Sequence, residues 1–195
     1  MDGERRRSDI LGAALECFLE SGITRASISD IREKSGASVG SIYHFFPSKE
    51  AIAAALYLDG LRGWTGATLP ATVDTSPQAT IAQIVSQAIE WGTQNSDLMR
   101  FMDENRFLLL RLGGLEEATA ILGAAREEGE RLLARLVKTG RMRAQSWEVA
   151  QPILLGPVQG WLQLHRHGQT VLDKEAARTT LIAAATRALV LEDAG

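Results

Sequence analysis

Apolar residues recur at intervals of three and four along most of the chain, which is the pattern of helices that bury one face. In the segment from Ser8 to Ser21, this stripe contains Ile10, Leu11, Ala14, Leu15, Phe18 and Leu19. Six further segments show the same period and are predicted helices: 48–64, 77–95, 96–113, 115–137, 146–167 and 174–191. Strict alternation, the pattern of a strand, does not extend over a useful length. The sequence therefore predicts an all-α fold.

Residues 27–47 predict two short helices joined by a glycine turn. Ser27, with Asp30 three residues later, forms a capping-box pattern, and Gly36 is placed to end the first helix in the left-handed backbone region. Ser38 can cap a second helix that ends before Pro47. Its apolar residues Ile42, Phe45 and Phe46 face the core, which leaves Val39, Gly40, Ser41, Tyr43 and His44 outward. This arrangement is typical of a helix-turn-helix, whose second helix enters the major groove of DNA.

The run from Ile31 to Ile52, which reads IREKSGASVGSIYHFFPSKEAI, resembles the DNA-binding signature of the tetracycline-repressor-like (TetR) family of bacterial transcription regulators. The resemblance extends back through the first predicted helix. It implies a helix-turn-helix DNA-binding domain at residues 1–50 and a helical effector-binding and dimerisation domain at residues 51–195. Val39 stands where many members carry a polar or basic residue, and Phe45 where His or Tyr is frequent. These two departures leave the operator sequence open.

The outward positions of the second short helix are candidates for DNA contact. Tyr43 and His44 can offer ring edges or a hydrogen bond to bases, while the smaller side chains permit close approach and contact with thymine methyl groups. Residues at helix boundaries can bind phosphate together with nearby backbone amides. The predicted set is Arg25, Ser27, Ser38, Val39, Gly40, Ser41, Tyr43, His44 and Lys49. Two interpretations stay open for Arg5–Arg7: a basic arm on DNA, or a solvated tail.

Net charge gives no argument for nucleic acid. The formal charge is −3, and residues 1–50 contain seven Lys or Arg against eight Asp or Glu. Phosphate contacts are made by a few positioned donors, so the placement of cations matters more than their number. The apolar fraction of 45% and the charged fraction of 23% are those of a globular protein rather than a disordered one.

The last predicted helix is apolar on two sides, so both sides need cover. One side can pack on its own domain and the other on a second subunit, and burial of both sides within one chain is the alternative. The resemblance implies a four-helix dimer interface formed by the last two long helices. The predicted interface residues are Leu155, Val158, Leu162, Leu181, Ala184, Ala185 and Ala188.

Large or adaptable side chains are concentrated in the middle of the chain, and all four tryptophans lie after residue 60. Ligand sites are mostly apolar clefts with a few polar groups. For each aromatic residue alone, core packing is the simpler explanation. As a group, and with the resemblance, they predict a site for an apolar or aromatic small-molecule effector, lined by Trp64, Trp91, Met99, Met102, Phe107, Trp161 and His165.

The sequence lacks the motifs of common enzyme classes, with no lysine-containing phosphate loop and no Gly-x-Ser-x-Gly elbow. His165 and His167 are two residues apart, a poor spacing for zinc on one helix face. We therefore predict no enzyme activity, no cofactor and no metal. The hypothesis is a transcriptional repressor that binds a palindromic double-stranded DNA operator as a homodimer and is released by a small molecule. The alternative is a dimeric sensing or interaction protein without specific operator binding.

Three features bear on the cellular compartment. Cys17 is the only cysteine, which excludes an internal disulfide. No apolar run approaches the roughly 20 residues that span a bilayer. The first residues contain no apolar segment of the kind that forms a secretion signal. These features predict a cytoplasmic protein with no membrane partner.

Overall fold

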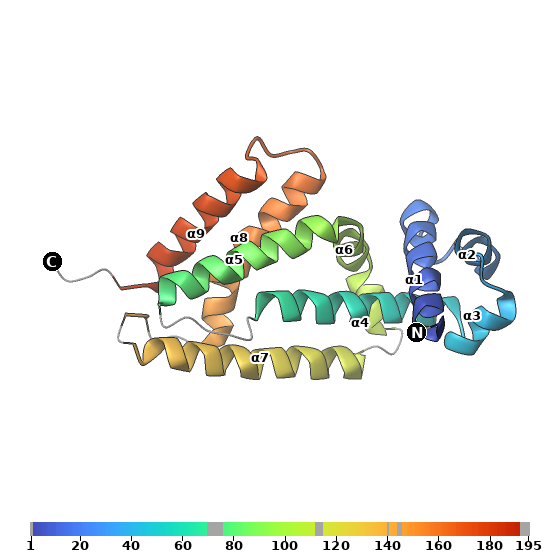
Figure 1. Ribbon diagram of the computed structural model, residues 1–195, viewed down its shortest axis with the longest axis horizontal. Coiled ribbons are helices and arrows are strands. Elements are labelled where there is room, and N and C mark those ends of the chain that lie inside the picture. Colours follow the sequence, from blue (N-terminus) through green and yellow to red (C-terminus); the bar gives the residue numbers. More distant parts are fainter. Residues whose placement is uncertain (1, 70–75, 112–114, 140, 144–145, 192–195) are drawn as a thin grey trace. The chain divides into compact units, whose positions relative to one another are not determined.

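The computed structural model describes residues 2–69, 76–111, 115–139, 141–143 and 146–191. Within these ranges every named element is an α-helix (Figure 1): α1 Asp2–Ser21, α2 Ile28–Ser35, α3 Val39–Phe45, α4 Lys49–Thr68, α5 Pro77–Gln94, α6 Ser96–Arg111, α7 Leu115–Val137, α8 Trp147–Arg166 and α9 Lys174–Leu189. The β-type pairing of the described residues is one isolated antiparallel bridge between Met142 and Val190. The predicted all-α fold is confirmed.

Helix ends with a recognisable cap fall where the sequence predicts them. Ser76 caps α5 by accepting a hydrogen bond from the Ala79 N–H, and Pro77 occupies the first turn. The range of α7 is the predicted one, 115–137. The predicted helix ends at Gly113 and Gly140 lie outside the described residues.

Two helices are longer than predicted. α1 begins at Asp2 rather than at Ser8, because residues 4–7 are Glu and Arg, which are good helix formers. α4 continues to Thr68 instead of stopping near Trp64. There the Thr68 hydroxyl donates to the Trp64 carbonyl oxygen over 2.9 Å, a side-chain-to-backbone bond that helical threonines commonly make.

The chain divides into two compact units. Each unit contains two separate stretches of the chain, so the division differs from a single boundary after residue 50. The first unit contains residues 1–61 and 97–119, and the second contains residues 62–96 and 120–195. The first unit includes part of α6 because Phe101 stacks on Phe18 of α1, with ring centroids 5.9 Å apart. Gly60 of α4 also packs closely on α6, since a Cβ at this position would lie 3.2 Å from Leu98 Cγ.

The first unit has a small aliphatic core that holds two very short helices. α2 and α3 have eight and seven residues, too few to be stable alone in water. Ile31 of α2 and Ile42 of α3 are fully buried together with Ile10 and Ile52. Burial of one such side chain contributes about 1.5–3 kcal/mol, so these contacts hold α2 and α3 in place.

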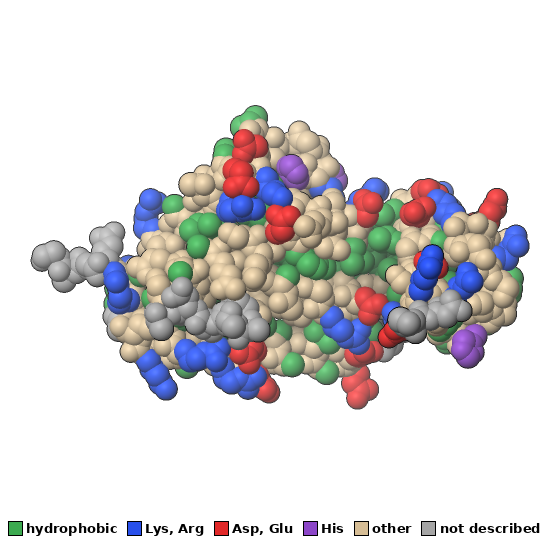
Figure 2. Space-filling model, viewed as in Figure 1, with side chains coloured by type: hydrophobic (Ala, Val, Ile, Leu, Met, Phe, Trp, Pro, Cys, Tyr) green, Lys and Arg blue, Asp and Glu red, His purple; other side chains and the backbone are tan. Residues whose placement is uncertain are grey.

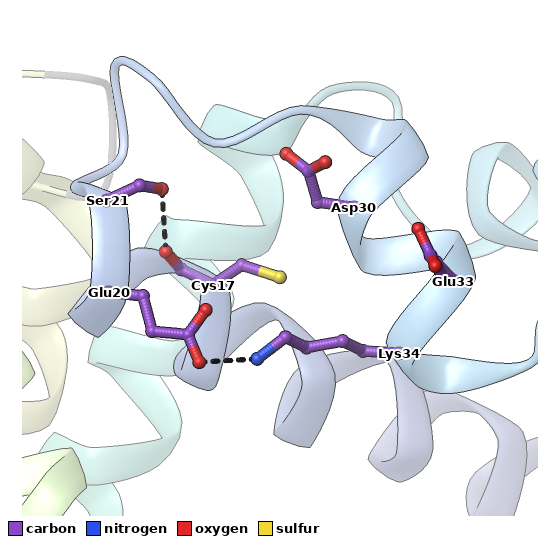
Figure 3. A pocket seen from close by; sticks show the side chains of 6 residues that line it. All are labelled: Cys17, Glu20, Ser21, Asp30, Glu33 and Lys34. Atoms are coloured by element: carbon purple, nitrogen blue, oxygen red, sulfur yellow. Dashed lines mark hydrogen bonds and ion pairs between the residues drawn. The ribbon is translucent and has the colours of Figure 1, made fainter.

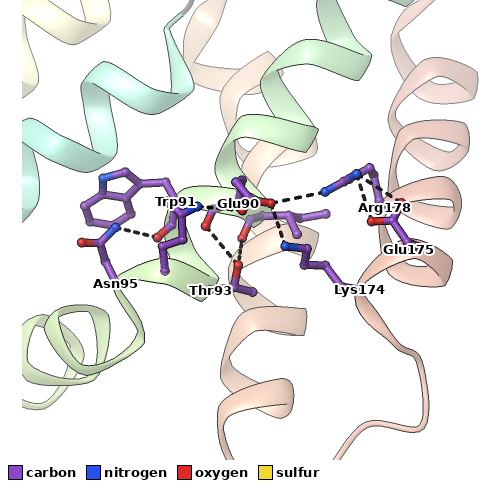
Figure 4. A network of polar contacts seen from close by, with 9 residues as sticks. Glu90, Trp91, Thr93, Asn95, Lys174, Glu175 and Arg178 are labelled. Carbon is purple, nitrogen blue, oxygen red and sulfur yellow. Dashed lines mark hydrogen bonds and ion pairs between the residues drawn. The ribbon is translucent and has the colours of Figure 1, made fainter.

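The second unit is built around α5, α8 and α9, which pack against one another. The α5 stripe of Ile81, Ile84, Val85, Ala88 and Ile89 is buried. A cluster of ionic side chains joins α5 to α9, in which Glu90 accepts a hydrogen bond from Lys174 Nζ over 2.7 Å (Figure 4). Arg178 lies 3.5 Å from the same carboxylate. The hydrogen bond from Lys174 is the main reason that the pKa of Glu90 lies below its usual value.

The molecular surface carries charges of both signs. On the face shown in Figure 2, Lys and Arg side chains are interspersed with Asp and Glu. This pattern agrees with the nearly balanced composition, and it gives no single basic patch on that face. Among the helices described, none is long and apolar enough to cross a membrane.

Candidate nucleic-acid interface

The turn between α2 and α3 has the geometry that its sequence predicts. The Ser27 backbone N–H donates to Asp30 Oδ2 over 2.9 Å, and the Asp30 N–H donates to Ser27 Oγ over 3.2 Å, which completes the capping box. The Ser27 hydroxyl also donates to Asp30 Oδ2, over 2.8 Å, and the bond from the Ser27 N–H together with this one lowers the pKa of the Asp30 carboxyl below its usual value. Gly36 ends α2 at φ 65° and ψ 9°, a left-handed conformation that favours glycine. The path of the chain from α2 into α3 is thereby fixed.

α3 presents one face to solvent and the other to the core. Ser38 caps the helix by accepting a hydrogen bond from the Ser41 N–H over 3.1 Å. Ile42 is fully buried, whereas Val39 is 45% exposed and Tyr43 is 51% exposed. His44 is exposed as well, and its ring meets that of Phe45 edge-on at 5.1 Å. Val39, Gly40, Tyr43 and His44 are exposed and Ile42 and Phe46 are buried, as expected, whereas Ser41 and Phe45, which were expected to face outward and inward, are both half-buried.

Gly40 lies on the outer face of α3 with open space around it. A Cβ built at this position would meet only Ser38 Oγ, at 4.0 Å. Nothing inside the unit therefore requires glycine here. A residue without a side chain on an outward helix face lets another molecule approach the backbone closely.

Two predicted phosphate contacts at helix boundaries are already bonded to the protein. Lys49 Nζ donates to the carbonyl oxygens of Thr24 (2.7 Å) and Ala26 (2.9 Å), so it ties the start of α4 to the α1–α2 turn. An ammonium group has three N–H donors, and one therefore stays available for a phosphate oxygen. Arg25 Nε donates to the Ser21 carbonyl oxygen over 2.9 Å. The guanidinium has further N–H groups beyond this bond.

The basic residues near the N-terminus lie within α1 rather than in a separate arm. Arg5 and Arg6 are exposed. Arg7 instead turns toward its own unit, where Nη1 donates to Asp59 Oδ2 of α4 over 3.1 Å. Its guanidinium carbon also lies 5.6 Å from the centre of the Phe46 ring. Sequence reasoning missed these contacts, because Arg7 and Asp59 are far apart in the chain and no local signal pairs them.

A surface groove between α1 and α2 has a different chemistry (Figure 3). It measures about 410 Å³ and is lined by Cys17, Glu20, Ser21, Asp30, Glu33 and Lys34. Lys34 Nζ donates to Glu20 Oε1 over 2.6 Å and to Glu16 Oε2 over 3.3 Å. Burial raises the pKa of the Cys17 thiol, which disfavours the reactive thiolate. Because carboxylates dominate its lining, this groove is unsuited to phosphate.

The residues predicted to line an effector site are distributed over both units. In the second unit, Trp64 is buried and meets Trp91 edge-on at 5.9 Å, and the buried Trp161 stacks on His165 at 4.6 Å. Met99, Met102 and Phe107 belong to the first unit, where Met99 is buried, Met102 is half-buried and Phe107 is 81% exposed. The structure thus brings four of these residues together as two aromatic pairs.

The residues predicted to form a dimer interface divide into two groups. Leu155, Val158, Leu162 and Ala185 are covered by the chain itself and fill the core of the second unit. Leu162, for example, packs where a Cβ on Gly92 of α5 would otherwise stand. Leu181 is half-buried, while Ala184 and Ala188 are exposed on α9. Only the second group offers surface that a partner can contact.

Two short helices joined by a glycine turn, with an outward second helix on a buried aliphatic core, define a helix-turn-helix DNA-binding unit. Residues 10–56 match the family model described as "Bacterial regulatory proteins, tetR family". The helix-turn-helix region of this chain is therefore similar to that of the tetR family of bacterial regulatory proteins.

Two curated relatives are regulators. The HTH-type transcriptional regulator RutR of Escherichia coli strain K12 is 28% identical over 141 residues, which cover 70% of this chain and 64% of RutR. The chain thus spans a little under two thirds of the length of that relative. The HTH-type transcriptional repressor KstR2 of Rhodococcus jostii RHA1 is 34% identical over 108 residues, which cover 53% of this chain and 52% of KstR2. These relatives are transcriptional regulators and not enzymes.

Solved structures share the fold. The TetR family regulator PfmR from Thermus thermophilus superposes with a TM-score of 0.74 at 22% identity, over 90% of this chain and 96% of PfmR. The ketosteroid transcriptional regulator KstR2 of Mycobacterium tuberculosis superposes with a TM-score of 0.70 at 17% identity, over 96% of each chain. The helical fold of this chain is therefore one found in other regulators of this kind.

Proposed function

We propose that this protein is a ligand-responsive transcriptional repressor, which binds a palindromic operator as a homodimer and is released when a small molecule binds its second unit. The observation that carries the proposal is the outer face of α3, where Val39, Tyr43 and His44 are exposed between two fixed helix ends. This face matches a helix inserted into a major groove, and the match of residues 10–56 to the tetR family model supports the same use.

The chemistry of α3 favours a particular kind of base contact. Its sequence, VGSIYHF, contains no Arg, Lys, Asn or Gln, the side chains that make paired hydrogen bonds to guanine or adenine. Val39 instead offers an apolar group suited to the methyl of thymine, and the ring groups of Tyr43 and His44 offer single hydrogen bonds. Lys49 and Arg25 are assigned to phosphate, through the donors that their internal bonds leave over.

The dimer proposal changes its residues in view of their burial. We assign the interface to the exposed side of α8 and α9, two helices that pack against each other. On α8 this side carries Gly156 and Gly160, and a Cβ on either would meet nothing within 4 Å. On α9 it carries Ala184 and Ala188. Small residues four apart let helices approach closely, which a four-helix interface between two copies requires.

The effector proposal rests on one buried donor. Trp161 is 5% exposed, and its Nε1–H has no hydrogen-bond acceptor among the described residues. An unmet buried donor is costly and is uncommon in folded proteins. A mostly apolar effector that carries an acceptor oxygen would satisfy this donor. If it binds the DNA-free form better, operator affinity falls by the same factor.

The proposed function is tested by selection of operator sequences from a random duplex library, followed by fluorescence anisotropy with the selected duplex. Tyr43→Ala is expected to weaken binding by about 0.5–1.5 kcal/mol, the usual net contribution of a single hydrogen bond. The control is Leu122→Ala on α7, which changes an exposed side chain and should leave operator affinity unchanged. Failure to select any sequence would favour the alternative, a sensing protein without specific operator binding.

A further inference from the structure

We propose that Arg7 is a positioning residue for DNA binding, which holds the end of α3 against α1 and α4 without touching DNA itself. The inference rests on the proposed function and gives Arg7 a role that differs from both sequence interpretations, a basic arm on DNA and a solvated tail. It concerns the first unit alone, to which Arg7, Phe46 and Asp59 all belong.

The two ends of α3 are held differently. Its start is fixed by the Ser38 cap and by the preceding turn, where Ala37 is buried. Its end depends on Phe46, which is 5% exposed and whose N–H donates to the Ile42 carbonyl oxygen over 2.9 Å. Pro47 follows and cannot continue the helix. Ile42 holds the body of α3 in the core, and the position of the helix end therefore depends on what holds the Phe46 ring.

Arg7 contacts that ring from another helix. Its guanidinium carbon lies 5.6 Å from the ring centre, within the range of a favourable cation–π contact. The same guanidinium donates through Nη1 to Asp59 Oδ2 over 3.1 Å, which fixes its position against α4. One side chain of α1 thus joins the end of α3 to the middle of α4.

The contact leads on to the proposed DNA face. The rings of Phe46 and Phe45 have centroids 6.4 Å apart, and the Phe45 ring meets His44 edge-on at 5.1 Å. A displacement of Phe46 therefore moves groups that are in contact with the exposed His44. Because His44 and Tyr43 are adjacent on α3, a small tilt of the helix end shifts both base-contacting groups.

Long-range charge effects predict the opposite result for one variant, which makes the inference testable. Asp59→Asn removes a negative charge, so a purely electrostatic effect would strengthen binding to a polyanion. If Asp59 instead holds Arg7 in place, the same substitution weakens operator binding. The carboxylate is 36% exposed and the guanidinium is 41% exposed, so the ion pair alone adds little to stability.

The experiment compares Arg7→Gln, Asp59→Asn and the double variant in the full-length protein, with an operator duplex selected by the wild type and a scrambled duplex of equal length. Arg106→Gln and Asp9→Asn are matched controls, because each removes an exposed charge from the first unit. We expect each single variant to lose about three- to tenfold in operator affinity, or about 0.7–1.4 kcal/mol. The double variant should lose no more than either single variant.

Three readouts separate this role from others. Removal of a residue that contacts phosphate reduces the slope of log affinity against log salt concentration by about 0.9. Arg7→Gln should leave that slope unchanged. Affinity for the scrambled duplex should not fall. Thermal unfolding followed by circular dichroism checks that each variant is folded at the assay temperature. A loss of operator affinity then cannot be due to unfolded protein.

The outcomes are decisive in both directions. Tighter operator binding by Asp59→Asn, additive losses in the double variant, or a reduced salt slope in Arg7→Gln would each overturn the inference. If the wild type selects no operator at all, the proposed function fails. If the wild type selects an operator and Arg7→Gln binds it equally well, only the inference about Arg7 fails.

Discussion

Gly40→Ala is expected to separate folding from DNA binding, because the structure gives glycine no internal role at this position. A Cβ at residue 40 meets only Ser38 Oγ, at 4.0 Å, so the methyl group fits without strain. Alanine is a better helix former than glycine by about 0.5–1 kcal/mol in a helix interior. Residue 40 lies in the first turn of α3, and we expect a gain at the lower end of that range. For a chain of 195 residues this corresponds to a rise in Tm of about 1–2 °C.

The same methyl group is expected to weaken operator binding. If the start of α3 lies against base edges, the added carbon must be accommodated in a closely packed interface, which costs about 1–3 kcal/mol. This cost is a loss of about 5- to 150-fold in affinity. No charge changes, so the salt dependence of binding should stay the same. The two effects have opposite signs, and a general loss of folding cannot imitate them.

The measurement is fluorescence anisotropy with a duplex selected by the wild type, paired with thermal unfolding of the same samples. Gly12→Ala is the matched control, since Gly12 is exposed on α1 and a Cβ there meets nothing within 4 Å. It should gain stability and bind as the wild type does. Wild-type operator affinity in Gly40→Ala would refute the reasoning that this face of α3 approaches DNA closely.

Further predictions concern a cap, an ion pair, a buried donor and the dimer. Ser27→Ala should cost about 0.5–2 kcal/mol of unfolding free energy, measured by urea, because it removes the α2 cap. Lys174 lowers the pKa of Glu90 in the folded protein. The Glu90 carboxylate therefore stabilises the fold at pH above its unfolded-state pKa, near 4.3, and this stabilisation is lost as the pH falls through the lower folded-state pKa. Glu90→Gln should reduce this loss of stability at acid pH, measured by urea unfolding at several pH values. Trp161→Phe should cost less stability in urea unfolding than the loss of buried packing alone predicts, since it also removes an unmet donor. Ala184→Glu should shift the mass measured by light scattering toward the monomer, whereas the exposed Ala134→Glu on α7 should not.

The sequence was a good guide to helix ends and turns that are determined by a cap or a glycine. Ser27 with Asp30, Gly36 and Ser38 determine the turn between α2 and α3 through hydrogen bonds and backbone angles that involve only neighbouring residues. The outer face of α3 could be predicted for a related reason. Once Ile42 is assigned to the core by its apolar character, helical geometry decides which side chains point away.

Contacts between distant residues had no such signal. Arg7 was one of three adjacent arginines in the sequence, and only folding distinguishes it from Arg5 and Arg6 by bringing Asp59 and Phe46 beside it. The pairing of Trp64 with Trp91 is of the same kind, since it depends on how α4 and α5 pack in the second unit. Residue type indicated aromatic packing there, but not which rings meet.

The burial of the apolar residues of α8 shows why an apolar pattern alone assigns a helix face poorly. The large residues Leu155, Val158 and Leu162 are the obvious candidates for a dimer, yet they are covered within one chain because α5 needs an apolar face to pack on. What stays outside on α8 includes Gly156 and Gly160, which contribute little to any hydrophobicity count. A helix that must pack closely against its copy needs small residues on that side, so its partner face can look less apolar than its core face. The proposed interface therefore follows the position of small residues relative to large ones rather than the total of apolar residues.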